Sequence, residues 1–250
     1  MATNRRPNNQ AHTHDGPSGR RAEPDSLSDD RRRREERILD AAAALLVRWG
    51  YRKTTIDDVA REAGVGKGTI YLHWRDKREL FGATLRRASR QAVAETLRRV
   101  AADPDGGLPH RLWTHGLLAA LENPLLAALM KGRRDIFEGL AGAFEPAAVQ
   151  QMAGDFAEYA VRLQRAGLIR ADLPVSVIGF LSSALKIGVI HTPDVLGQGA
   201  MPSMEQLTEA ISDLMRRWLE PERPLGDSAM GKQLSIEWLE KLKTFEDQLQ

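Results

Sequence analysis

Along most of the chain, apolar residues recur every three or four positions, which is the spacing of one face of an α-helix. The first such stripe follows Ser28, a candidate N-cap, and ends at Gly50, a residue type that often terminates helices. Its apolar members are Ile38, Ala42, Leu45 and Trp49. The spacing therefore predicts a helix over about 28–50 with these four side chains on its buried face.

Two short helices joined by a tight turn are expected next. Thr55 is a candidate N-cap, and Asp58 follows three residues later, as in a capping box with aspartate in place of glutamate. This helix is expected to end at Gly64, and the second to run over about 66–74. Ala60 is small enough to let the two helices cross closely, and a glycine in the turn permits a positive φ. The pattern is that of a helix-turn-helix.

The remaining two thirds of the chain carry the same helical periodicity, interrupted by glycine and proline. The predicted helices cover residues 77–100, 108–122, 124–140, 146–166, 174–191 and 203–220, with one more amphipathic helix within 221–250. No run alternates apolar and polar residues as a strand would. The chain is therefore predicted to be all-α, with a three-helix domain over 28–82 and a larger helical domain over 83–220.

Residues 1–27 differ from the rest in composition. They are rich in proline, glycine, asparagine, serine and arginine, with almost no large apolar side chains. Such a segment buries too little surface to offset the entropy of ordering, so we expect a disordered arm.

Charge is unevenly distributed along the chain. Residues 31–90 hold 16 basic and eight acidic side chains, whereas residues 91–250 hold 16 basic and 21 acidic ones. A basic block on an acidic remainder favours a partner that carries phosphates, although a solvated charged face would have the same composition. The arginines at 31–34 could add sequence-independent phosphate contacts or simply be solvated.

Several classes of protein are excluded or disfavoured by composition. The chain has no cysteine, which excludes disulfides, a thiol nucleophile and a cysteine zinc site. It has no run of 18 apolar residues and no apolar leader, so we expect a cytoplasmic protein without a membrane span. No metal-ligand spacing and no close set of catalytic residues is visible, so neither a metal, a cofactor nor an enzymatic activity is expected. GVGKGT departs from the phosphate-binding loop pattern, because Gly68 stands where serine or threonine is required.

Residues 33–81 resemble the DNA-binding domain of the TetR family of bacterial regulators. The resemblance rests on ILDAAAALLVRWGYRKTTIDDVA, on the turn AGVGKGTIYLHW, and on DKRELF at the start of the next helix. Gly66 departs from the family, which often has a capping serine there. The resemblance implies phosphate contacts from Thr54, Thr55, Tyr71 and Lys77, and a groove-facing set of Lys67, Gly68, Thr69 and His73.

The same resemblance implies a homodimer that reads a near-palindromic operator in double-stranded DNA. The candidate interface residues lie on the last two helices of the core: Leu181, Ala184, Leu207, Ile211, Leu214 and Trp218. An apolar stripe of this kind also suits the core of a single chain. Both interpretations stay open at the level of sequence.

The resemblance further implies that the larger domain holds a small-molecule effector. Candidate lining residues are Trp113, Leu117, Met130, Phe137, Met152 and Phe156, although apolar residues at helical spacing also suit an ordinary core. The helix within 221–250 extends beyond the usual family core. It could enlarge the dimer contact, cover the ligand entrance, bind another protein or pack on its own domain.

The sequence thus predicts a transcriptional regulator, a repressor whose operator binding is modulated by an unknown effector. A ligand-independent or architectural DNA-binding protein is the alternative, and it predicts steep salt dependence with little discrimination between sequences.

Overall fold

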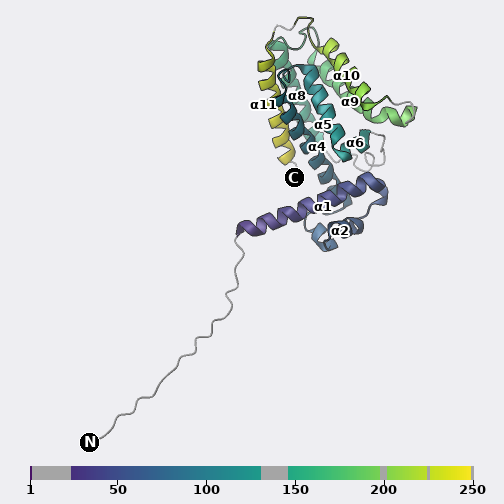
Figure 1. Ribbon diagram of the computed structural model, residues 1–250, viewed down its shortest axis with the longest axis vertical. Helices are drawn as coiled ribbons and strands as arrows, with labels where there is room; N and C mark the ends of the chain where they lie inside the picture. Colours follow the sequence, from purple (N-terminus) through teal and green to yellow (C-terminus); the bar gives the residue numbers. More distant parts are fainter. Residues whose placement is uncertain (2–23, 131–145, 198–201, 224–225, 249–250) are drawn as a thin grey trace. The chain divides into compact units, whose positions relative to one another are not determined.

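The computed structural model describes Met1 and residues 24–130, 146–197, 202–223 and 226–248 (Figure 1). Every regular element in these ranges is an α-helix, as predicted. The helices are α1 (Pro24–Lys53), α2 (Ile56–Ala63), α3 (Lys67–Tyr71), α4 (Lys77–Ala102), α5 (Pro109–Glu122), α6 (Pro124–Met130), α8 (Pro146–Arg165), α9 (Val175–Leu196), α10 (Met204–Leu219) and α11 (Ser228–Gln248). Two compact units are distinguished, residues 1–34 and residues 35–250.

The described part of the first unit is the beginning of α1. The helix begins at Pro24, four residues before the predicted start at Ser28. Within this stretch Arg32 donates to Asp29 at 2.9 Å, and Arg33 lies 3.9 Å from Asp30. These pairs are exposed and join successive turns of one helix, so each is worth only a few tenths of a kcal/mol.

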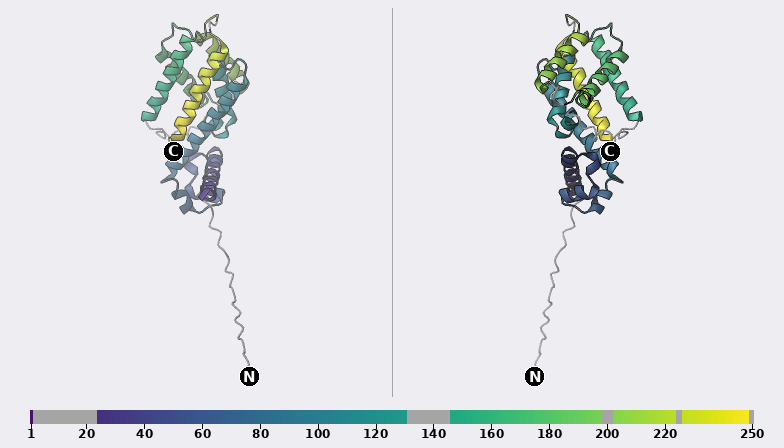
Figure 2. Two further views of the ribbon diagram at one scale, coloured as in Figure 1. Left: turned by 90° about the vertical axis from the view of Figure 1, so that its left-hand side faces the viewer. Right: turned by 90° about the vertical axis from the view of Figure 1, so that its right-hand side faces the viewer.

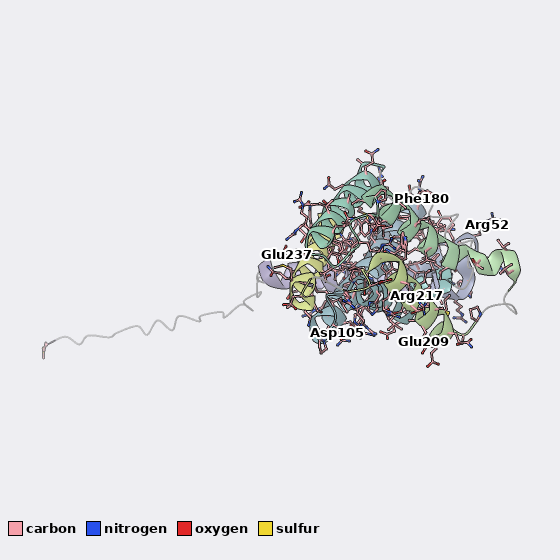
Figure 3. All side chains as sticks on the ribbon, turned by 90° about the horizontal axis from the view of Figure 1, so that it is seen from above. Arg52, Asp105, Phe180, Glu209, Arg217 and Glu237 are labelled. Atoms are coloured by element: carbon pink, nitrogen blue, oxygen red, sulfur yellow. The ribbon has the colours of Figure 1, made fainter. Side chains whose placement is uncertain are left out.

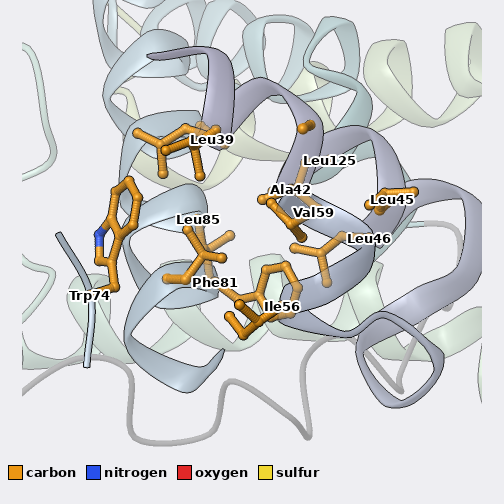
Figure 4. Packing of buried hydrophobic residues seen from close by; sticks show 14 of the residues in the cluster. Leu39, Ala42, Leu45, Leu46, Ile56, Val59, Trp74, Phe81, Leu85 and Leu125 are labelled. Atoms are coloured by element: carbon orange, nitrogen blue, oxygen red, sulfur yellow. The ribbon is translucent and has the colours of Figure 1, made fainter. Parts of the chain in front are cut away.

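Within the second unit, α1 to α4 and part of α6 enclose one apolar core (Figure 4). Ile38, Leu46, Val59 and Phe81 are completely buried there. Trp49, predicted to share the buried stripe of the first helix, is 37% exposed instead. The stripe ends before it because the helix is interrupted at the next residue, Gly50, whose φ of 81° is not helical.

Local signals fix the short helices. Thr55 and Asp58 form the predicted capping box, and Gly64 ends α2 with a φ of 65°. Helix α3 is shorter than predicted, because regular helix ends at Tyr71 and not at Trp74. Trp74 is nevertheless buried and belongs to the same core.

A second core lies among the helices of the larger domain, from α5 and α8 to α11. Leu163, Ile178 and Met215 are almost completely buried in it. Helix α9 continues to Leu196, five residues beyond the predicted end, while the predicted helix over 124–140 is described only up to Met130.

Helix α11 packs on its own domain, beside α8 and α4 (Figure 2). The hydroxyls of Tyr159 and Ser235 lie 2.8 Å apart, and the Tyr159 ring stacks on Trp238. The beginning of α11 lies so close to the loop after α4 that a Cβ on Gly107 would stand 1.9 Å from a carbonyl oxygen of Ser228. Of the four roles that the sequence left open, packing on its own domain is the one that the structure supports.

Candidate nucleic-acid interface

The exposed side of α3 is the centre of the candidate interface. Tyr71 is 48% exposed and Leu72 is 78% exposed, whereas Ile70 between them and α2 is fully buried. Open space surrounds Gly68, so another molecule could approach its backbone closely. Thr69 is half-buried on the same short helix. One side of α3 thus holds the core while the other presents a hydroxyphenyl, a glycine and an apolar side chain to solvent.

Lys67 contributes charge at the beginning of α3. Its Nζ lies 2.9 Å from Oδ2 of Asp57 on α2, and both side chains are about half exposed. The hydrogen bond from Lys67 to Asp57 raises the pKa of the ammonium. An ammonium has three donors, so Lys67 can keep this partner and still donate to a phosphate or a base edge.

Lys77 occupies the first position of α4, after the N-cap Asp76. Its Nζ lies 4.4 Å from the ring centroid of Tyr51 and 6.0 Å from that of Phe81. Partial loss of hydration lowers the pKa of Lys77. Two aromatic rings therefore hold the ammonium of Lys77 in place, and neither ring neutralises its charge. The ammonium can still attract an anion.

Two residues of the predicted set do not fit a direct contact through their side chains. Thr54 is completely buried, and its hydroxyl donates to the carbonyl of Gly50 at 2.8 Å and to that of Leu45 at 3.3 Å. The His73 side chain is only 8% exposed and lies 3.8 Å from Glu35. Thr54 thus secures the end of α1, and His73 packs inward, because α3 ends before its position. Both assignments are corrected.

Thr55 has a definite local role. Its hydroxyl accepts from the backbone N–H of Asp58 at 3.2 Å and donates to the Asp58 carboxylate at 2.6 Å. Capping accounts for Thr55 without a DNA contact. Sequence reasoning passed over the neighbouring Arg52 and Lys53, which are exposed in the last turn of α1. The signal in the sequence is a pair of consecutive cations that is separated from the capping Thr55 by one residue.

The predicted effector residues fall into three groups. Trp113 and Leu117 of α5 are half-buried against the core of the larger domain, and Met152 of α8 is half-buried as well. The Phe156 ring lies 5.9 Å from that of Trp238 on α11, so packing within the domain occupies it. The side chain of Met130 and the whole of Phe137 lie outside the described residues.

The predicted dimer residues divide between the core and the surface. Ile211 is 5% exposed and belongs to the core of its own chain, and Leu207 and Trp218 pack against that core. Burial removes Ile211 from the predicted interface, whereas Leu207 and Trp218 are only partly buried and stay predictions. Leu181, Ala184 and Leu214 are exposed. Phe180 (labelled in Figure 3) and Ile187, which the sequence did not single out, are exposed as well.

Two negative findings concern the described residues only. They include no group of three or more histidine, aspartate or glutamate side chains that could hold a metal ion. None of their helices is both long and apolar enough to cross a bilayer.

Known proteins resemble this chain in its N-terminal region and in its fold. Residues 38–84 match the model of the bacterial regulatory proteins of the tetR family. An uncharacterized HTH-type transcriptional regulator of Mycobacterium tuberculosis is 38% identical over 80 residues, which are 32% of this chain and only 40% of that protein. The HTH-type transcriptional repressor BepR of Brucella suis is 26% identical over 188 residues, 75% of this chain and 81% of BepR.

A solved structure agrees in fold. The crystal structure of a TetR family transcription regulator from Marinobacter aquaeolei superposes with a TM-score of 0.54 at 20% identity, covering 78% of this chain and 98% of that one. At this identity the likeness concerns the fold alone.

Proposed function

We propose that this chain recognises a specific sequence in double-stranded DNA as a transcriptional regulator, because residues 38–84 match the model of the bacterial regulatory proteins of the tetR family. The observation that carries the proposal is the exposed side of α3, where Tyr71, Leu72 and the open backbone at Gly68 stand free of the core. A helix presented in this way fits the major groove, where base edges are distinguishable.

Positive charge beside α3 supports the same proposal. Lys67 lies at its first position and Lys77 just beyond it, with Arg52 and Lys53 exposed at the end of α1. Contacts from these side chains to phosphates would fix the register of α3 on the duplex, while Gly68, Thr69 and Tyr71 meet the groove. Thr54 and His73 are not part of this set, because both side chains are buried in the fold.

We further propose that the active species is a homodimer. The exposed apolar residues of α9 and α10, Phe180, Leu181, Ala184, Ile187 and Leu214, form the candidate dimer face. A monomer that left these side chains in water would expose a patch of the kind that usually marks an interface. Two recognition helices related by a twofold axis would read a near-palindromic DNA sequence. The protein would act in the bacterial cytoplasm.

The finer role is that of a repressor with a small-molecule effector bound in the larger domain. The effector would favour a conformation in which the two α3 helices no longer match the operator, and α4, which contributes to both domains, would transmit the change. Similarity to the repressor BepR supports this role.

The test is selection of bound duplexes from a random DNA pool by the purified full chain at physiological salt. Enrichment of a near-palindrome is expected. Binding without enrichment would support an architectural, sequence-independent role instead.

A further inference from the structure

A lysine of the larger domain has no carboxylate partner within the part of the chain that the structure describes. Nζ of Lys186 on α9 lies 4.8 Å from the ring centroid of Trp113 on α5. Among residues 24–130, 146–197, 202–223 and 226–248, no carboxylate pairs with Lys186. By contrast, Lys67 pairs with Asp57 and Lys241 with Asp155.

The surroundings of the Lys186 ammonium favour an anion as its partner. The residue is exposed overall, yet loss of hydration lowers the pKa of its ammonium. The ammonium itself lies over the indole ring of Trp113. A cation in such surroundings gains from an anion that enters beside it, because the attraction is weakly screened there.

A second polar group without a partner lies one turn earlier on the same helix. Ser182 is only 4% exposed, and its Oγ has no hydrogen-bond partner among the described residues. Residues four apart share one face of a helix. A buried hydroxyl without a partner destabilises the fold, so a ligand that accepts from Ser182 would recover that loss.

We propose that Lys186, Ser182 and Trp113 anchor the acidic group of the effector, and that the effector is an amphipathic anion. Lys186 and Ser182 would donate to the carboxylate or phosphate oxygens, and the apolar body would lie against Trp113 and its half-buried neighbour Leu117. This inference rests on the proposed ligand-responsive function and names the chemical class of its ligand.

The test is calorimetric titration of the full chain with octanoate, octyl phosphate and octan-1-ol. The two acids separate a carboxylate site from a phosphate site, and the alcohol reports apolar binding alone. At least one acid is expected to bind at least ten times more tightly than the alcohol. Absence of binding by both acids, or equal binding of the alcohol, would overturn the proposal.

Variants locate the site. Lys186→Met keeps the stem over Trp113 and is expected to weaken binding of the acid at least tenfold while leaving binding of octan-1-ol unchanged. Lys243→Met, which removes an exposed lysine of α11, is the matched control and should leave both unchanged. Equal affinity of Lys186→Met and the parent chain for the acid would contradict the assignment.

Ser182→Ala separates a ligand contact from a structural role. It is expected to weaken binding of the acid about threefold to tenfold without lowering the midpoint of urea unfolding, because it removes a hydroxyl that has no partner in the fold. A lowered midpoint with unchanged affinity would contradict the proposal. DNA selection is measured without these ligands, so failure of the anion site and failure of the regulator assignment remain distinguishable.

Discussion

Arg87 of α4 bonds Asp40 of α1, with Nη2 of the guanidinium 2.8 Å from Oδ1 of the carboxylate. Nη1 of the same guanidinium donates to the Glu36 carboxylate at 2.7 Å and to the Glu36 carbonyl at 3.2 Å. The Arg87 side chain is only 7% exposed. Arg87 and Asp40 also line a cavity of about 350 Å³ between α1, α4 and α6. This arginine therefore ties α1, the first helix of the N-terminal core, to α4, which continues into the larger domain.

Replacing Arg87 tests how much this tie contributes. Arg87→Met keeps most of the packing but leaves two carboxylates and one carbonyl without their donor, so the free energy of unfolding should fall by about 2 kcal/mol. Arg98→Met removes a solvent-screened pair with Glu95 and should change the free energy of unfolding much less than Arg87→Met does. Urea unfolding measures both. Equal effects of the two substitutions would contradict the account.

Thr54 is expected to affect stability and not DNA contact. Thr54→Val removes the hydroxyl that serves Gly50 and Leu45 and should lower the free energy of unfolding by about 1–2 kcal/mol. Thr54→Ser keeps the hydroxyl and should recover most of that loss. Operator affinity of Thr54→Val, measured by fluorescence anisotropy well below its unfolding midpoint, should stay within about twofold. A tenfold loss in the folded variant would restore Thr54 to the interface.

Thr54 also marks the boundary of what the sequence could predict. Helix order, the capping box at Thr55 and the turn at Gly64 were all predictable, because they depend on residues within four positions of each other. Burial of the Thr54 hydroxyl depends on Leu45, nine residues away, and the inward position of His73 depends on where α3 ends. The contact of Lys186 with Trp113 joins two residues that are 73 positions apart in the chain. The spacing of apolar residues along the chain does not reveal such contacts. Lys186 could therefore not be predicted from the sequence as a candidate ligand residue.

Acid should weaken the fold through Asp103, at the C-terminal end of α4. Burial alone would raise its pKa, but hydrogen bonds from His115, the Asp105 backbone and Arg111 outweigh burial and lower it. A lowered carboxyl pKa contributes stability that is complete above the ordinary value near 4 and is lost as pH falls through the lowered value. The free-energy difference between the parent chain and Asp103→Asn should therefore be about 1–2 kcal/mol at pH 6 and shrink below pH 4. A difference that grows toward acid would contradict this sign.

Replacing Phe180 by glutamate should convert the dimer into a monomer. Its side chain is 73% exposed on α9, so Phe180→Glu costs the folded chain little but places a charge within the candidate dimer face. Sedimentation at micromolar concentration should give a dimer for the parent chain and a monomer for this variant. Met230→Glu, an equally drastic change at a 51% exposed position of α11, should remain dimeric. A Phe180→Glu dimer as tight as the parent would place the interface elsewhere.

The central claim is that α3 reads a DNA sequence, and the ratio of two affinities tests it most directly. The dissociation constants of the full chain for the selected duplex and for a scrambled duplex of the same composition are compared at physiological salt. The account predicts a ratio of about 10³ or more, falling at least tenfold in Tyr71→Ala while its helix content and dimerisation are kept. A ratio near one for the parent chain, or an unchanged ratio in Tyr71→Ala, would contradict it.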